Sequence, residues 1–487
     1  MKLLSDILYK ARIEEVVGST NVAIDKIQFD SRKVEAFTVF VAIPGTQVDG
    51  HKYIDTAIDK GAVAVVCETL PENIQAGVTY VKVKSSSEAL GFISANFYDN
   101  PSSKLKLVGV TGTNGKTSVV TLLHQLFTAL GYKAGMLSTV VNKIGKEELK
   151  STHTTPDAIS INHLMHDMVE AGCDYCFMEV SSHAIDQHRV TGLNFKVAVF
   201  TNITHDHLDY HETFNNYIKA KKGLFDQLDS QAFALINKDD NHGDIMVQNT
   251  AAKVFGFSVR SLAEYKAKII ENQFTGLQLN INGNDVWTKL VGKFNAYNLL
   301  AVYGVADLLG QEKINVLTEI SNLNTVEGRF QYVRTSDDVA GIVDYAHTPD
   351  ALENVLRTIK DIRTGNEQVI TVVGCGGDRD KTKRPEMARI ACEFSDRVIL
   401  TSDNPRSEDP QVIITEMQAG VPAQHFKKTT QIVDRKEAIK AAISLSQPGD
   451  IILIAGKGHE KYQEINGVRH DFDDMAIMKE LFKLMKS

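Results

Sequence analysis

A short glycine-rich segment has the composition of a loop that binds phosphate groups. It consists of Gly112, Thr113, Asn114, Gly115, Lys116 and Thr117. An apolar stretch over residues 104–110 predicts a buried strand before it, and apolar residues at helical spacing over 117–130 predict a helix after it. Glycines let backbone N–H groups approach phosphate oxygens, Lys116 supplies a positive charge, and the Thr117 hydroxyl can reach Mg²⁺. The segment therefore predicts a nucleotide-binding site.

The glycine spacing departs from the strict G-x-x-x-x-G-K-[ST] pattern. That pattern would place a glycine at position 110, which is Val110, whereas Gly109 and Gly112 flank it. An ordinary glycine-rich turn between a strand and a helix is the alternative. Because a Lys-Thr pair follows the last glycine directly, the phosphate-binding interpretation is favoured.

A second set of residues has the composition of a metal site. Glu179 ends a strand-like apolar run over 173–180. Another such run, over 197–204, is followed by a cluster of ligand-type side chains: His205, Asp206, His207, Asp209 and His211. Open α/β sheets bind ligands at the carboxyl ends of their strands, so these residues could hold the Mg²⁺ that accompanies ATP. Each of them could instead be a solvated loop charge or a helix cap.

One lysine lies where a helix pattern predicts an apolar residue. Apolar side chains at helical spacing mark one face of a predicted helix: Phe214, Tyr217, Ile218, Leu224 and Phe225. Lys221 is four residues after Tyr217 and four before Phe225, so it falls on the same face. A buried ammonium group is unfavourable unless it is paired or modified. Lys221 therefore either extends to solvent or has an inward-facing functional role.

Strand-length apolar runs alternate with helix-period segments along most of the chain. This alternation predicts an α/β fold with largely parallel sheets. A single core stops growing at roughly 250–300 residues, so the 487 residues predict about three domains. Breaks in the pattern place them at 1–100, 101–331 and 332–487. Further strands are expected at 369–373, 397–401 and 450–455, and the last helix from about Asp473.

Composition narrows the class of protein. The net charge of −8 argues against nucleic-acid binding, which needs clustered Lys and Arg. An acid at position 6 and the absence of an 18-residue apolar run argue against a secretion signal or a membrane span, so we expect a cytoplasmic protein. The five cysteines are too scattered for a disulfide framework, and we expect them to be buried thiols.

Together with several further motifs, these features resemble the Mur ligase family. The further motifs are Glu179-Val180-Ser181-Ser182-His183, Asn202–Tyr210, Gly292-Lys293-Phe294-Asn295, Gly328-Arg329-Phe330, Asp344-Tyr345-Ala346-His347-Thr348-Pro349 and Gly456-Lys457-Gly458-His459-Glu460. They occur in the family's order over nearly the whole chain. The resemblance implies a UDP-binding N-terminal domain, a central P-loop ATPase domain and a C-terminal Rossmann-like domain.

Within the family, the motifs most closely match the enzymes that add the third residue of the peptidoglycan stem peptide. The resemblance implies that ATP, with Mg²⁺, phosphorylates the free D-Glu carboxylate of UDP-MurNAc-L-Ala-D-Glu, and that an incoming amine displaces phosphate. It also implies a cytoplasmic enzyme, which we expect to be a monomer. A folylpolyglutamate synthase-like ligase and a non-catalytic nucleotide switch are more remote alternatives. Folate enzymes of this superfamily lack such an N-terminal domain, and a switch leaves Lys221 unexplained.

The resemblance also assigns roles to individual residues. The six residues of the glycine-rich loop are expected to bind the nucleotide, and Lys116 and Thr117 also to contact phosphate and metal. Glu179 and His207 match metal-binding and catalytic positions, and Asn298, Arg329 and Asp344 match positions at the nucleotide. Lys221 matches the family's carbamylated lysine, an anion that helps to position the metal. The UDP-sugar peptide is expected at Ser31, Thr46, Gln47, Val48, Thr154, Thr155, Ser181, Gln187 and Arg189.

The segment Asp403-Asn404-Pro405-Arg406 bears on the choice of amine. It follows the predicted strand 397–401 and matches the sequence found in enzymes that add meso-diaminopimelate. This substrate differs from lysine by a distal carboxylate, which a guanidinium can hold with two hydrogen bonds. Further contacts to the same amino acid match Arg379, Gly456 and Glu460. Addition of lysine or another diamino acid is the nearest alternative, although lysine would leave Arg406 unpaired.

Overall fold

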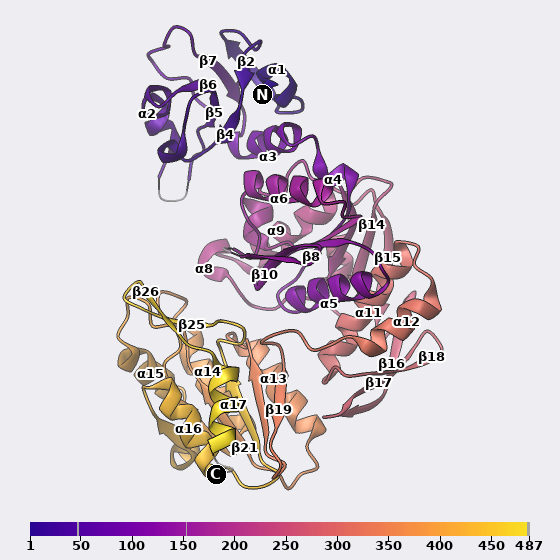
Figure 1. Cartoon of the computed structure of the whole chain (residues 1–487). Coiled ribbons are helices and arrows are strands. Elements are labelled where there is room, and N and C mark those ends of the chain that lie inside the picture. Colours follow the sequence, from indigo (N-terminus) through magenta and orange to yellow (C-terminus); the bar gives the residue numbers. More distant parts are fainter. Residues whose placement is uncertain (46–47, 152, 485–487) are drawn as a thin grey trace.

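The computed structural model describes residues 1–45, 48–151 and 153–484. Its α/β architecture confirms the predicted fold class, with three main sheets that follow one another along the chain (Figure 1). The N-terminal sheet lies at one end of the molecule and the C-terminal sheet at the other in this view. None of the described helices is long and apolar enough to cross a membrane.

The N-terminal sheet has five strands in the order β2-β7-β6-β5-β4. They are β2 (Ile13–Val17), β4 (Lys26–Gln28), β5 (Thr38–Val41), β6 (Ala62–Cys67) and β7 (Thr79–Val83). Only β2 runs antiparallel to its neighbour. The short strands β1 (Lys2–Leu3) and β3 (Ala23–Ile24) pair separately. The helices are α1 (Leu4–Ile7), α2 (Ile54–Asp59) and α3 (Ser86–Phe97).

An eleven-stranded sheet forms the centre, in the order β11-β10-β9-β12-β8-β13-β14-β15-β16-β17-β18. Its strands are β8 (Lys106–Thr111), β9 (Ala134–Leu137), β10 (Val141–Ile144), β11 (Glu147–Lys150), β12 (Tyr175–Glu179), β13 (Phe195–Phe200), β14 (Phe233–Asn237), β15 (Lys253–Ser258), β16 (Tyr265–Gln273), β17 (Gly276–Ile281) and β18 (Asn284–Thr288). The run from β9 to β16 is parallel. Because the chain leaves β8 toward β9 and later returns to β13 on the other side, β8 lies at a topological switch point, where open sheets bind ligands.

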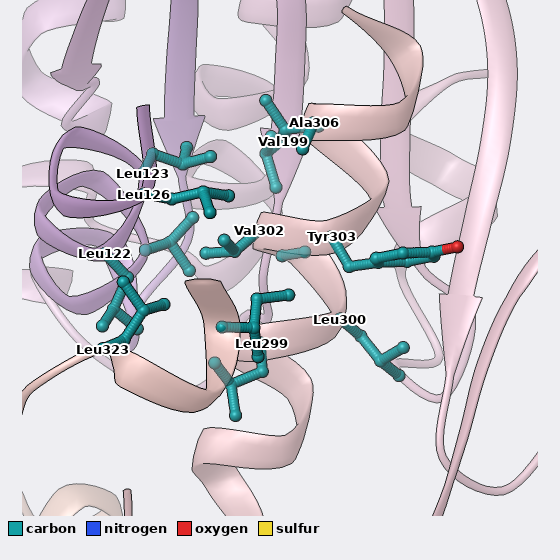
Figure 2. Close-up of a cluster of buried hydrophobic side chains, with 14 of the residues drawn as sticks. Leu122, Leu123, Leu126, Val199, Leu299, Leu300, Val302, Tyr303, Ala306 and Leu323 are labelled. Carbon is teal, nitrogen blue, oxygen red and sulfur yellow. The ribbon is translucent and has the colours of Figure 1, made fainter. Parts of the chain in front are cut away.

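Helices cover both faces of the central sheet. They are α4 (Pro101–Lys104), α5 (Lys116–Ala129), α6 (Ala158–Glu170), α7 (Ser182–Asp186), α8 (Leu208–His211), α9 (Phe214–Asp226), α10 (Gly243–Met246), α11 (Lys293–Leu308) and α12 (Lys313–Asn322). Figure 2 shows α5 and α11 packed together, with Leu122 and Leu126 facing Leu299 and Val302 beside Val199 of β13. A second core, on the opposite face, includes residues of α6, α7 and α9. The first core thus packs α5 and α11 against one face of the central sheet, and the second packs α6, α7 and α9 against the other.

The C-terminal sheet has six strands in the order β19-β20-β24-β21-β22-β23. They are β19 (Gln331–Arg334), β20 (Ala340–Asp344), β21 (Val369–Val373), β22 (Arg397–Leu400), β23 (Thr429–Gln431) and β24 (Ile451–Ala455), of which only β19 is antiparallel. The helices are α13 (Pro349–Ile362), α14 (Lys383–Phe394), α15 (Pro410–Gln418), α16 (Arg435–Leu445) and α17 (Asp474–Leu484). A hairpin of β25 (Tyr462–Ile465) and β26 (Val468–Asp471) follows β24.

Most expected elements have close counterparts, and one strand is shorter than expected. The apolar run over 197–204 is a strand only to Phe200. The chain then turns because Thr201 and Asn202 bond to the glycine-rich loop: the Thr201 hydroxyl donates to the Asn114 carbonyl oxygen at 2.6 Å. All five cysteines are buried free thiols, as expected.

Candidate active site

The glycine-rich loop connects β8 to α5, as its sequence context predicted. Gly112 has a φ of 153°, and a Cβ there would lie 1.9 Å from the Thr201 hydroxyl oxygen, so a larger residue would displace the neighbouring loop. Gly115 has a φ of 89°, which favours glycine. The first helical residue is Lys116, whose Nζ donates to the carbonyl oxygens of Gly112 at 2.7 Å and Thr113 at 2.8 Å. The Lys116 side chain therefore lies against the glycine-rich loop, at the N-terminus of α5. A glycine-rich loop before a helix N-terminus is an arrangement that binds phosphate.

A second loop supports the glycine-rich loop from β13. The Thr113 N–H donates to the Asn202 carbonyl oxygen at 2.8 Å, and the Asn114 N–H donates to the Asn202 side chain at 2.9 Å. No pattern in the sequence predicted this supporting role, although Asn202 begins one of the motifs. These bonds make the two loops a single unit at the carboxyl edge of the sheet.

Glu179 ends β12 beside this unit and is almost completely buried. Its Oε1 accepts a hydrogen bond from the Thr139 N–H at 2.8 Å. Its Oε2 is also buried and has no hydrogen-bond partner among the described residues. A buried carboxylate oxygen without a partner is unfavourable in an apolar interior, and a cation would satisfy it.

His207 faces the same cavity from the loop before α8. Loss of surrounding water, reinforced by the positive charges of Lys116 and Lys221, lowers the pKa of His207 to about 4. The imidazole is therefore neutral near pH 7, the form that can bind a metal ion. Among the described residues, however, no three His, Cys, Asp or Glu side chains gather closely enough to hold a metal by themselves. A metal held here would need oxygen atoms from the substrates, water or a modified lysine.

Lys221 points inward from α9, so the solvent-extending alternative is wrong. Its side chain is 1% exposed, and Nζ donates to the Gly112 carbonyl oxygen at 2.9 Å. Nζ also lies 4.6 Å from the centre of the Tyr217 ring. Burial, with repulsion from Lys116, lowers the pKa of Lys221 far below its usual value. An amine with a strongly lowered pKa thus lies directly beneath the glycine-rich loop.

The C-terminal part of the chain contributes the opposite wall. Arg329 donates from Nη2 to the Thr117 hydroxyl at 3.2 Å and stacks on the Tyr345 ring at 4.6 Å. Asp344 accepts a hydrogen bond from the Phe330 N–H at 2.6 Å, and burial raises the pKa of Asp344 to about 6. Arg329 thus connects this wall directly to the last residue of the glycine-rich loop.

The segment 403–406 follows β22 and is held by the β25–β26 hairpin. Arg406 has a φ of 54°, an unusual value for a residue other than glycine. Its N–H donates to the Glu464 carbonyl oxygen at 3.0 Å, and its Nη1 donates to the Gly377 carbonyl oxygen at 2.6 Å. The Asn404 amide donates to Glu460 at 2.7 Å. Burial and the nearby Asp403 raise the pKa of Glu460.

One cavity of about 810 Å³ joins these walls. The predicted residues that line it are Thr113, Asn114, Gly115, Lys116, Thr117, Thr154, Glu179, Ser181, His207, Lys221, Arg329, Arg379, Asp403, Asn404, Arg406, Gly456 and Glu460. It also contains residues to which the sequence had assigned no role, among them Asp350 and Lys383. Residues of the central and C-terminal sheets therefore share one site.

The remaining predicted residues lie outside this lining. Asn298 approaches Gly115 from behind, since a Cβ on Gly115 would lie 2.8 Å from its Oδ1. Gln187, Arg189 and Thr155 form a separate network, in which Arg189 donates to the Thr155 carbonyl oxygen at 2.9 Å. The other predicted residues that do not line the cavity are Gly112, Asp344, Pro405, Ser31 and Val48. Thr46 and Gln47 lie outside the described residues.

Comparison with known proteins agrees with this architecture. Family models match three consecutive parts of the chain: "Mur ligase family, catalytic domain" at residues 23–98, "Mur ligase middle domain" at 110–306 and "Mur ligase, glutamate ligase domain" at 328–458. The chain therefore belongs to the Mur ligase family.

Similar relatives share one name. UDP-N-acetylmuramoyl-L-alanyl-D-glutamate--2,6-diaminopimelate ligase of Cytophaga hutchinsonii is 57% identical over 479 residues, covering 98% of each chain. The protein of the same name from Bacteroides thetaiotaomicron is 52% identical and covers 99% of this chain and 100% of its own. A solved structure of a ligase with this name has a TM-score of 0.72 at 33% identity and covers 100% and 99% of the two chains.

A folylpolyglutamate synthase from Mycobacterium tuberculosis shares the fold, with a TM-score of 0.62 at 18% identity. The match covers 93% of that chain but only 76% of this one. Part of this chain is therefore not aligned with that enzyme.

Proposed function

We propose that the chain joins meso-diaminopimelate to the D-Glu side-chain carboxylate of UDP-MurNAc-L-Ala-D-Glu, with hydrolysis of ATP, during peptidoglycan synthesis. The observation that carries the proposal is the shared cavity, which has a phosphate-binding loop on one wall and the segment 403–406 on the other. The names of the relatives at 52–57% identity support the same substrates.

Two chemical problems define such a reaction. A carboxylate is a poor acyl donor, and its phosphorylation supplies a good leaving group. The transferred phosphoryl group carries negative charge, which positively charged side chains can stabilise. Lys116 and Arg329 converge on the loop for this purpose, within hydrogen-bonding distance of Gly112 and Thr117 respectively.

The residues around Glu179 fit a hard divalent cation such as Mg²⁺. Glu179 offers the unpartnered Oε2, Thr117 offers a hydroxyl, and His207 offers a neutral imidazole. A bound Mg²⁺ would neutralise charge on the phosphates. The protein's own part is to keep these atoms in place, which the Thr139 N–H does for Glu179.

We further propose that Lys221 is carbamylated in the active enzyme. Carbamate formation requires the neutral amine, which attacks carbon dioxide and releases a proton to solvent, and the lowered pKa of Lys221 favours that form of the side chain. The product is an anion, so Lys116, which disfavours a positive charge on Lys221, would attract it. The change would also add oxygen atoms in the cavity that Glu179 and His207 line.

The amine substrate would bind between the segment 403–406 and Glu460. The Arg406 backbone N–H donates to the Glu464 carbonyl oxygen and Nη1 donates to the Gly377 carbonyl oxygen. The side chain lines the cavity, where the rest of its guanidinium group could bind a carboxylate. Glu460 suits an ammonium group. The UDP-sugar peptide would extend from Thr154 and Ser181 toward the N-terminal part of the chain, where Ser31 begins a short 3-10 helix between β4 and β5.

The enzyme assay follows from this assignment. Phosphate release from ATP is expected to require both UDP-MurNAc-L-Ala-D-Glu and meso-diaminopimelate. Lysine in place of diaminopimelate should be a poor substrate, because the Arg406 side chain would be left without its carboxylate partner. Equal turnover with the two amines would contradict the proposed specificity.

We also propose that the enzyme acts as a monomer in the cytoplasm and has no nucleic-acid partner. The negative net charge argues against a nucleic-acid partner. Light scattering of the purified protein would test whether it is a monomer in solution.

A further inference from the structure

Asp350 links the C-terminal part of the chain to the loops that surround the proposed nucleotide site. It lies in the first turn of α13, directly after Pro349. Its Oδ2 accepts hydrogen bonds from the Asn114 amide at 2.7 Å and from the Thr204 hydroxyl at 3.2 Å. The three residues are separated by up to 236 positions in the sequence. A single carboxylate oxygen thus joins two loops of one sheet to a helix of another.

Both partners of Asp350 belong to the supporting unit described above. Asn114 is a residue of the glycine-rich loop, and its backbone N–H is bound to Asn202. The Thr204 N–H donates to the Thr113 hydroxyl at 3.0 Å. Any displacement of Asp350 relative to these residues would therefore change the position of the loop itself or break its contacts.

A purely local role would not explain these contacts. An acid in the first turn of a helix stabilises the helix through the dipole and the free N–H groups. In α13 the Thr348 hydroxyl already accepts from the Ala351 N–H at 3.3 Å. Asp350 instead accepts hydrogen bonds from the central sheet's loops and from Asn354 of its own helix.

We infer that Asp350 is a positioning residue, which sets the distance between the amine-binding wall and the phosphate-binding loop. The inference rests on the proposed function, because Arg406 and Glu460 hold the amine only if the chain is this ligase. Amide formation needs the amine close to the activated carboxylate, and the two bind to different sheets. A misplacement of about 1 Å can reduce turnover by roughly a hundredfold.

The other end of α13 offers a matched control. Asp361 forms an ion pair with Lys293 of α11, with 2.7 Å between Asp361 Oδ2 and Lys293 Nζ. This pair also joins the same helix to the central part of the chain, but both side chains are substantially exposed and neither lines the cavity described above. If any contact between α13 and the centre were equally important, the two carboxylates would have equal effects.

The test compares Asp350→Ala, Asp350→Asn and Asp361→Ala in the ligase assay. Asp350→Ala should lower kcat by about tenfold to a hundredfold, with an unchanged KM for the UDP substrate. Asp350→Asn should retain most activity, because its amide oxygen can accept the same bonds. Asp361→Ala should resemble the wild type. Equal kcat values for Asp350→Ala and Asp361→Ala would overturn the inference.

A double-mutant cycle with Asn114→Ala separates positioning from simple destabilisation. If Asp350 acts through Asn114, the combined loss in kcat should be smaller than the product of the two single losses. A fully multiplicative loss would overturn the inference. The Thr204→Val variant tests the same contact from the other side if Asp350→Ala does not fold.

Small-angle scattering gives a readout that does not depend on the reaction. Asp350→Ala should enlarge the radius of gyration of the protein with a non-hydrolysable ATP analogue, whereas Asp361→Ala should not. An unchanged radius in Asp350→Ala would count against the inference even if the wild-type chain showed no turnover. Absence of wild-type turnover with these substrates would by itself reject only the proposed function.

Discussion

Lys221 Nζ lies 2.9 Å from the carbonyl oxygen of Gly112, the residue that opens the glycine-rich loop. The contact joins the buried face of α9 to the loop at the end of β8, across 109 positions of sequence. It places an amine of lowered pKa within the supporting structure of the proposed phosphate site. A change of charge at Lys221 would therefore act directly on this loop.

Replacement of Lys221 by alanine should abolish most ligase activity, because the proposed carbamate oxygen is lost. Short carboxylates such as acetate or formate should restore part of it by occupying the space of the carbamate. The measurement is the rate of phosphate release with and without the added carboxylate. Wild-type activity of Lys221→Ala without any rescue agent would contradict the proposed role.

The Arg406→Lys substitution should reduce kcat/KM for meso-diaminopimelate by two orders of magnitude or more, since loss of a buried charge-assisted pair costs about 2–5 kcal/mol. Lysine keeps the charge but not the planar fork that binds a carboxylate with two hydrogen bonds. The rate with lysine as substrate should change little. Equal losses with both amines would show that Arg406 supports the loop rather than selecting the substrate.

Asp344 gives a prediction about pH. Its folded-state pKa of about 6 exceeds the usual 3.8, so between these values the folded chain binds more protons than the unfolded chain. The contribution of Asp344 to the unfolding free energy is therefore fully present below pH 3.8 and falls as pH rises through 6. Asp344→Asn removes this loss and should stabilise the protein by about 1–3 kcal/mol at pH 7.5, with little effect near pH 4.

Urea denaturation of both proteins at the two pH values measures the difference. Asp396→Asn is a suitable comparison, because this carboxylate lies partly exposed at the surface. A stabilisation of Asp344→Asn that is equal at both pH values would contradict the pH linkage. We expect the same variant to lose ligase activity, since Asp344 was assigned to the nucleotide site.

The buried pair of Arg435 and Asp474 should dominate the stability of the C-terminal sheet. The guanidinium donates to both carboxylate oxygens at 2.8 Å, and both side chains are fully buried. Asp474→Ala would leave an unpaired buried cation and should cost about 3–5 kcal/mol. Glu437→Ala, which breaks the exposed pair with Lys440, should cost less than about 1 kcal/mol in the same unfolding experiment.

Local sequence determined much of this molecule. Strand, glycine turn and helix follow one another over residues 106–129, because backbone preferences and apolar spacing act within a few residues. The place of Lys221 on the apolar face of α9 was predictable in the same way, whereas only the structure decided that its side chain points inward. Strand ends were predicted less well, since hydrogen bonds from Thr201 to the glycine-rich loop end β13 early.

Only the tertiary structure decided which of these segments meet. The contact of Arg329 with Thr117 and the contact of Asp350 with Asn114 both join residues that are distant in sequence. Spacing along the chain contains no information about such pairs, because they depend on how the central and C-terminal sheets pack against each other. The sequence by itself determined the chemical groups and the strand edges that carry them, and the packing of the two sheets decided that the groups share one cavity.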